Sequence, residues 1–320
     1  MNHAPDKTID TGYQCPRDPA EIWLARQWQN ILGFTVGIRE NFFGVGGNSL
    51  DAARLIDAIM AEFGVQLPLN AVTEHPTVER LATVLRGNDG VDYAAGRLSG
   101  ALVAIQDGDG TRPPLFLVHP DNGQASSYCR LAHALGEEFA VTGIQAAGLY
   151  TDAEPRATVP AMADAYIDAI RAEHPAGPYL LGGSGIGAAI AYEMAVRLHD
   201  VRLLAAIDAE LLEPPDTGTQ PWTPEPPRQP DLSRVLASWQ EHDLVPPDVA
   251  PEFAARSLRV WQANQDAMRD WRPSPYTGPI DILGRPQIPA LPATTAQRAH
   301  ECDADGRLAD TLRELLADQR

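Results

Sequence analysis

Lysine, cysteine and long apolar runs are scarce in this sequence. Lys7 is its only lysine, so nearly all positive charge comes from arginine. The three cysteines, Cys15, Cys129 and Cys302, lie far apart, match no metal-ligand spacing, and are typical of a reducing compartment. No apolar run approaches the roughly 18 residues that a membrane span needs, and the polar start is unlike a signal peptide. We therefore expect a cytoplasmic protein that crosses no membrane and holds no metal.

Positive charge is also scarce relative to negative charge. The chain has 25 Lys and Arg against 43 Asp and Glu, which gives a net charge of −18 at pH 7. This balance argues against nucleic acid as a partner, because the chain could not neutralise a run of phosphates. A hydrophobic fraction of 44% and a length of 320 residues are typical of a folded chain with two domains.

Residues 18–87 show the apolar spacing of a small four-helix bundle. Asp18 followed by Pro19 is an N-cap with proline at the first helical position, and Gly33 ends that helix. Two further segments have apolar residues at helical spacing. One follows a glycine-rich turn, and the other follows a threonine N-cap. The segment therefore predicts a compact helical domain.

The rest of the chain divides into a tail, a linker and an α/β domain. Residues 1–17 have no apolar pattern and predict a flexible tail, and residues 88–98 predict a linker. Residues 99–320 alternate short apolar strands with helices, which indicates a largely parallel sheet covered on both faces. A proline-rich insertion opens a predicted helical lid over about 213–275. The expected strands are Ala101–Gln106, Leu115–Val118, Phe139–Ile144, Tyr179–Leu181, Leu203–Ile207 and Ile280–Leu283.

A ten-residue motif at 41–50 reads Asn-Phe-Phe-Gly-Val-Gly-Gly-Asn-Ser-Leu. It resembles the phosphopantetheine attachment site of peptidyl carrier domains in nonribosomal peptide synthetases. The resemblance implies that Ser49 carries 4′-phosphopantetheine, whose thiol holds an amino acid or a peptide as a thioester. A helix N-terminus suits the phosphodiester, because the helix dipole favours negative charge there. The alternative is that Ser49 is only an N-terminal serine after a glycine turn.

Residues from about 98 to 320 resemble the thioesterase domain that ends many such synthetases, a member of the α/β-hydrolase fold. The motifs are Pro-Leu-Phe-Leu-Val-His-Pro at 114–120 and Tyr-Leu-Leu-Gly-Gly at 179–183. The family's nucleophilic serine follows the second motif at a strand-to-helix turn. Ungapped counting places Gly185 in that slot, and glycine has no side chain to attack a thioester. The alternatives are that Ser184 acts by a shifted register, or that this is an unrelated glycine turn.

The resemblance assigns the remaining catalytic roles by position. Asp208 follows a buried strand, where the family has its orienting acid, and His300 is the only histidine beyond His242. His300 lacks the family's flanking glycine and phenylalanine, so a surface histidine is an equally good interpretation. The backbone N–H groups of Asp121 and Ile186 would form the oxyanion hole. A carboxylate beside a developing oxyanion is electrostatically unfavourable.

The sequence thus predicts a peptidyl carrier domain beside a thioesterase-like domain that is inactive or much impaired. One alternative is release of the tethered product by hydrolysis or cyclisation, with Asp208 and His300 activating water or an amine directly. Another is that glycine replaced a natural serine at position 185. The expected partners are a phosphopantetheinyl transferase, upstream adenylation and condensation domains, or tailoring enzymes that act on the loaded carrier.

Overall fold

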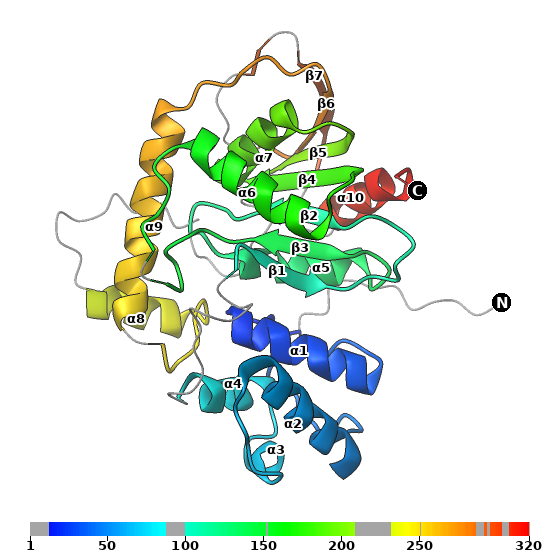
Figure 1. Cartoon of the computed structure of the whole chain (residues 1–320), viewed down its shortest axis with the longest axis vertical. Helices are drawn as coiled ribbons and strands as arrows, with labels where there is room; N and C mark the ends of the chain where they lie inside the picture. Colours follow the sequence, from blue (N-terminus) through cyan, green and yellow to red (C-terminus); the bar gives the residue numbers. More distant parts are fainter. Residues whose placement is uncertain are drawn as a thin grey trace.

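The computed structural model describes residues 13–87, 100–151, 153–208, 232–249, 251–285, 291–292, 295–302 and 307–319. These residues form a helical unit (residues 13–87) and a sheet unit that begins at residue 100 (Figure 1). The predicted linker and the proline-rich start of the predicted lid lie outside the described residues.

The helical unit contains four helices. They are α1 (Pro19–Leu32), α2 (Ser49–Phe63), α3 (Ala71–Glu74) and α4 (Val78–Arg86). The Asp18 side chain accepts a hydrogen bond from the Glu21 N–H at the start of α1, and Gly33 ends the helix at a φ of +85°. The apolar faces of the helices meet in one core, because apolar residues repeat along them at helical spacing. The largest fully buried side chains of this core are Trp28, Phe42, Leu24, Ile38, Leu55, Ile59, Leu81 and Leu85.

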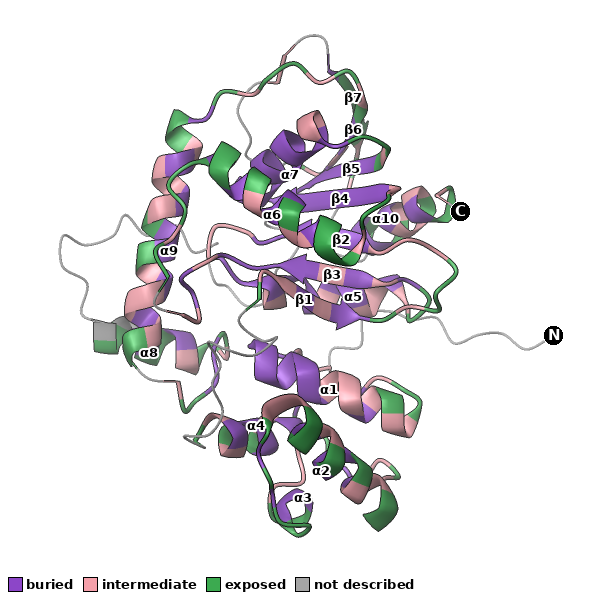
Figure 2. Ribbon diagram, viewed as in Figure 1, coloured by how far each residue is buried: buried purple, intermediate pink, exposed green. Residues whose placement is uncertain are grey.

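A seven-stranded sheet forms the centre of the sheet unit, in the order β1-β3-β2-β4-β5-β6-β7. Only β1 runs antiparallel to its neighbour, and the other pairs are parallel. Strands β2 and β4 are buried along their whole length, which Figure 2 shows in purple. The strands are β1 (Leu102–Gln106), β2 (Leu115–Val118), β3 (Val141–Ile144), β4 (Tyr179–Ser184), β5 (Val201–Ile207), β6 (Pro279–Leu283) and β7 (Ala296–His300).

Helices cover both faces of this sheet, as parallel strands require. One face packs against α6 (Val159–Glu173) and α7 (Ile186–Arg197). The other packs against the 3₁₀ helix η2 (Ala125–Tyr128), α5 (Cys129–Leu135) and α10 (Arg307–Ala317). The largely parallel, two-sided sheet that the sequence predicts is therefore present.

Strand β7 is absent from the prediction, and its position changes the interpretation of His300. Four of its five residues are exposed and the fifth, His300, is half-buried. A polar edge strand carries no apolar run or alternation, so hydrophobic periodicity does not reveal it. His300 is consequently the last residue of β7.

The described part of the predicted tail, residues 13–17, is packed between the two units. The Gln14 carbonyl accepts a hydrogen bond from Ile38 N–H in the helical unit, and the Tyr13 ring stacks on His133 of α5 at 4.0 Å. Arg17 is buried, with 6% of its surface exposed, and its carbonyl accepts from the Ser126 hydroxyl. These five residues are therefore packed against both units, and Arg17 is buried together with its ion-pair partner Glu21.

Two helices of the predicted lid are described, α8 (Leu232–Glu241) and α9 (Pro251–Asp270). Figure 1 shows α9 as a long helix beside the sheet, with α8 next to its N-terminal end. One face of α9 is buried, and its buried residues are Ala254, Ser257, Val260, Trp261, Asn264 and Ala267. This face points at the loop that follows β2, which makes α9 part of the candidate site.

Candidate active site

A sharp turn joins β4 to α7 and brings Gly185 to the carboxyl end of the sheet. Gly185 has φ +57° and ψ −126°, a backbone conformation that side chains disfavour, and α7 begins at Ile186. The turn is tight, because a Cβ added at Gly183 would lie 2.4 Å from the Gly187 carbonyl carbon. Gly185 therefore lies at the strand-to-helix turn between β4 and α7, and its assignment to the nucleophile position stays a prediction.

Ser184 lies before this turn and inside the sheet. It is the last residue of β4, it is fully buried, and its N–H donates to the Tyr128 hydroxyl at 3.0 Å. Its own hydroxyl has no hydrogen-bond partner among the described residues. The geometry therefore disfavours the shifted-register alternative, because Ser184 lies within β4 and Gly185 lies at the turn.

The carboxylate of Asp121 fills the space beside Gly185. A Cβ added at Gly185 would lie 2.5 Å from Asp121 Oδ2 and 3.0 Å from its Cγ. Asp121 Oδ1 also accepts a hydrogen bond from the Ile186 N–H at 3.3 Å. Burial raises the pKa of this carboxyl, and the Ile186 N–H opposes that shift. One of the two predicted oxyanion donors is thus occupied by the chain itself.

Helix α9 fixes the loop that carries Asp121. The Asn264 side chain, with 1% of its surface exposed, donates from Nδ2 to the Asp121 carbonyl at 3.0 Å. Val260 closes over Gly123 so tightly that a Cβ at Gly123 would lie 2.6 Å from Val260 Cγ1. The sequence does not indicate this role of Asn264, because the helix carries many other polar residues.

Asp208 and His300 each have a contact with another residue at this end of the sheet. The His300 Nε2 contacts Asp281 Oδ1 at 2.8 Å, and Asp281 also accepts from Arg298 at 2.7 Å. The Asp208 carboxylate accepts from the Arg285 N–H at 2.7 Å. His300, a residue of β7, thus turns to Asp281 of β6 in this geometry, and a catalytic pairing of His300 with Asp208 stays a prediction. The sequence signal for this contact is Asp281 itself. A charged residue within an apolar strand is almost never fully buried unless it has a partner.

The predicted carrier serine lies at the surface of the helical unit. Ser49 is the first residue of α2 and is exposed. The Asn48 side chain accepts from the N–H groups of Leu50 and Asp51, so these donors are not free for a phosphate. The helix dipole still favours a phosphodiester there, and nothing lies within 4 Å of a Cβ at Gly46, so there is room. An exposed hydroxyl with open surroundings fits a phosphopantetheine arm.

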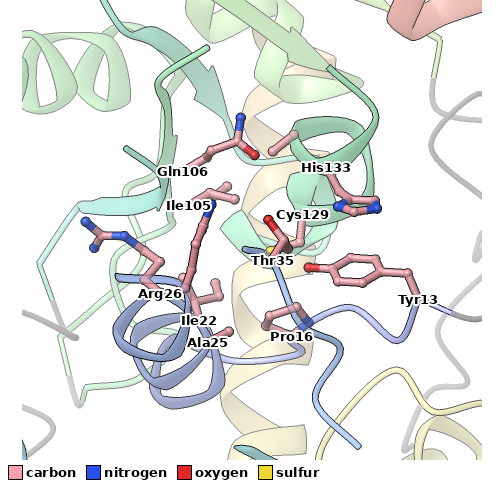
Figure 3. Close-up of a pocket in the computed structure, with 12 residues that line it drawn as sticks. Tyr13, Pro16, Ile22, Ala25, Arg26, Thr35, Ile105, Gln106, Cys129 and His133 are labelled. Atoms are coloured by element: carbon pink, nitrogen blue, oxygen red, sulfur yellow. The ribbon is translucent and has the colours of Figure 1, made fainter. Parts of the chain in front are cut away.

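A small cavity lies between the two units, away from Gly185. Figure 3 shows Tyr13, Arg26, Cys129 and His133 around it, contributed by residues before α1, by α1 and by α5. None of the predicted catalytic residues lines it. Within the described ranges, no group of three or more His, Cys, Asp or Glu side chains could hold a metal ion. The helices of those ranges also fall short of what crossing a membrane requires.

Comparison with known families assigns both units. Residues 113–314 match the thioesterase domain family, and residues 23–85 match the phosphopantetheine attachment site family. Because the first match covers more than half of the chain, the chain belongs to the thioesterase domain family. The second match identifies the helical unit as a carrier domain, the kind that bears a phosphopantetheine arm.

Similar curated proteins include nonribosomal peptide synthetases. CymA of Salinispora arenicola is 36% identical over 212 residues, which are 65% of this chain and 3% of that protein. Malpinin synthetase of Mortierella alpina is 31% identical over 257 residues, 80% of this chain and 3% of that protein. A dimodular nonribosomal peptide synthase of Bacillus subtilis is 35% identical over 211 residues, 64% of this chain and 9% of that protein. The chain thus spans only a small part of each relative's length.

One solved structure matches nearly the whole chain. It is holo-AB3403, a four-domain nonribosomal peptide synthetase bound to AMP and glycine, with a TM-score of 0.74. The sequences are 24% identical, and the match covers 99% of this chain and 26% of that one. The chain therefore has a carrier–thioesterase fold of the kind found in these synthetases.

Proposed function

We propose that this chain carries an aminoacyl or peptidyl group on a phosphopantetheine arm at Ser49, beside a thioesterase domain that does not release it. The arm's terminal thiol supplies the thioester link to the carried group. The observation that carries the proposal is the position of the Asp121 carboxylate, which fills the slot beside Gly185 and occupies the Ile186 N–H.

Acyl transfer through a serine needs three features, and each is altered here. The nucleophile is missing at Gly185, the His300 imidazole is held by Asp281, and one oxyanion donor is occupied. Removing a nucleophile alone leaves a residual acceleration that comes from the oxyanion hole and from binding. Because Asp121 blocks an oxyanion donor, we expect even this residual acceleration to be lost.

The proposal implies that other proteins act on the loaded arm. A phosphopantetheinyl transferase would attach the arm to the exposed Ser49, and adenylation or condensation domains, or tailoring enzymes, would load or modify the carried group. The relatives' printed names, which describe synthetases of nonribosomal peptides, support this setting. Localisation in the cytoplasm, where such enzymes would meet the carrier, remains part of the proposal.

Intact-protein mass spectrometry tests the proposal. The full chain is loaded through a promiscuous phosphopantetheinyl transferase and an aminoacyl-pantetheine donor, with Ser49→Ala as the variant that should accept no arm. Loss of the acyl group is then followed in the native protein and in Asp121→Asn, Asp208→Ala and His300→Ala. We expect one slow rate for all four proteins. Fast loss from the native protein that one of these substitutions abolishes would contradict the proposal.

One observation favours the alternative of release by direct attack of water or an amine. The Asp121 carboxylate lies in the slot itself, and burial raises its pKa towards the range of a useful general base. Asparagine at position 121 keeps the shape and the acceptor for Ile186 N–H, but cannot take a proton. If Asp121→Asn alone slows acyl loss, Asp121 is the base of an active enzyme.

A further inference from the structure

Three arginines of the helical unit contact the segment between α8 and α9. Arg17 Nη1 lies 2.5 Å and Arg39 Nη2 lies 2.7 Å from Asp243 Oδ1. Arg86 binds Asp248 through two parallel contacts of 2.6 Å, from Nε and from Nη2. We call these five residues the arginine clamp. The clamp joins the carrier domain to the described part of the predicted lid.

The clamp is anchored on buried charge within the helical unit. Arg17 is 6% exposed and also binds Glu21, which is fully buried, while Arg86 binds Asp18 at 2.8 Å. Partly buried, two-point arginine–carboxylate pairs hold their geometry better than exposed single contacts. We therefore expect Arg17 and Arg86 to stay in place when Asp243 or Asp248 is neutralised, because Glu21 and Asp18 remain.

Asp243 is held in a defined position to receive two of these arginines. It has a φ of +58°, and the Leu244 N–H donates to the Trp239 carbonyl at the end of α8. Aspartate and asparagine tolerate this left-handed conformation better than most residues. Asparagine at position 243 would therefore keep the backbone while removing the charge.

From the clamp, packed contacts lead along α9 to the slot. The Phe253 ring, in the first turn of α9, lies 5.5 Å from the Tyr150 ring of the sheet unit. Further along, Val260 covers Gly123, and Asn264 holds the Asp121 carbonyl. The Asp121 carboxylate then reaches Ile186. A single helix thus connects the carrier contact to the residue that fills the slot.

We infer that docking of the carrier domain through the arginine clamp keeps the slot filled. The clamp holds α9 against the loop at 120–123, and α9 holds Asp121 beside Gly185. Opening the clamp would loosen α9 and allow the carboxylate to leave the Ile186 N–H. The clamp is then a contact between the domains that controls the position of the Asp121 carboxylate. This inference rests on the proposed function in one respect. It takes the state in which the Asp121 carboxylate fills the slot as the resting state of the protein.

Amide hydrogen exchange of the full chain tests the coupling, since local opening raises exchange in proportion to its population. The test variants are Asp243→Asn and Asp248→Asn. The matched control is Asp200→Asn, because Asp200 also has a φ of +58° and its carboxylate pairs with the exposed Arg202, which is not part of the clamp. We expect both test variants, and not the control, to raise exchange several-fold in 242–249, in α9, in the 120–123 loop and at Ile186.

Faster exchange confined to 242–249, with the 120–123 loop and Ile186 unchanged, would overturn the inference. An Asn264→Ala variant supplies the second readout. It should raise exchange at 120–123 and Ile186 while leaving 242–249 unchanged, and adding Asp243→Asn to it should change the loop no further. The exchange experiment does not depend on acyl loss. A protein that releases its acyl group would refute the proposed function and still show whether the clamp is coupled to the slot.

Discussion

The Asp121 carboxylate lies where a side chain at Gly185 would have to be, 2.5 Å from the position of its Cβ. The two residues come from different strand ends and are complementary in size. Glycine has no side chain at this turn, and aspartate fills the space and takes the Ile186 N–H. Under the proposed function, the pair accounts for two departures from the thioesterase pattern at once, glycine at the proposed nucleophile position and the acidic residue at the proposed oxyanion position.

Complementarity between these two positions predicts a non-additive effect on stability. Gly185→Ser should destabilise the fold by about 1–3 kcal/mol, because its φ of +57° is strained for a side chain and Asp121 blocks the Cβ. Asp121→Ala should relieve part of this cost, with a coupling energy of about 0.5–3 kcal/mol in chemical denaturation. Asp208→Ala combined with Gly185→Ser is the control and should be additive. Additivity with Asp121→Ala would show that the carboxylate does not occupy the slot.

The pKa of Asp121 predicts a pH-dependent effect of one substitution. Burial raises this pKa in the folded protein, so the folded state binds its proton more tightly than the unfolded chain does. The contribution of Asp121 to stability is present below its unfolded pKa of about 3.9 and is lost as the pH rises through the folded pKa. Asparagine does not titrate, so the Asp121→Asn variant should become more stable relative to the native protein as the pH rises from about 4 to about 7. Denaturant titrations of both proteins at the two pH values measure their free energies of unfolding. A difference between the two proteins that is the same at both pH values would contradict the prediction.

His119 predicts a loss of stability in mild acid. Its Nδ1–H donates to the Pro120 carbonyl, its Nε2 accepts from the Tyr166 hydroxyl, and burial lowers its pKa from 6.5 to about 4. The folded state therefore binds fewer protons than the unfolded chain, and stability falls as the pH drops from 6.5 to about 4. The full loss is about 3 kcal/mol.

The variant that checks this loss is His119→Asn, which should be less stable at neutral pH but should lose less stability on acidification. The exposed His199 provides the control, since His199→Asn should keep the native pH dependence. Equal acid sensitivity of all three proteins would show that His119 does not contribute to it.

The glycine turn before Ser49 predicts that one glycine is essential for the carrier fold. A Cβ at Gly47 would lie 2.5 Å from the buried Phe42 ring, whereas a Cβ at Gly44 would lie 3.3 Å from its nearest neighbour, the Asn41 carbonyl. Gly47→Ala should destabilise the helical unit by about 1–3 kcal/mol and slow loading of the arm, and Gly44→Ala should do so much less. Thermal unfolding and the rate of loading measure both effects. Equal effects of the two substitutions would contradict the role of Phe42.

The sequence predicted the elements with strong apolar periodicity and missed those held by polar contacts. Strands such as β2 and β4 are buried on both faces, so their continuous apolar runs identify them. The glycine turn at Gly185 was located by counting from β4, because the strand and α7 fix its length. Strand β7 and the packed residues 13–17 were missed, since exposed edge residues and ion pairs leave no hydrophobic pattern.

The candidate site was predictable only where position along the chain decides it. Asp121 was expected to offer its N–H to an oxyanion, and the structure instead turns its carboxylate onto the Ile186 N–H. The pairing of His300 with Asp281 depends on strand register between β6 and β7, which the sequence alone does not give. The arginine clamp joins residues more than 160 positions apart, beyond the reach of local spacing.

The most direct test of the central claim compares the native loaded protein with a free thioester. The rate of acyl loss from the arm is measured by intact mass, beside hydrolysis of the same aminoacyl-pantetheine in the same buffer. Because the slot is filled and an oxyanion donor is occupied, we predict the same rate for both. An acceleration of roughly 10³-fold or more, which binding and an open oxyanion hole provide even without a nucleophile, would contradict the account.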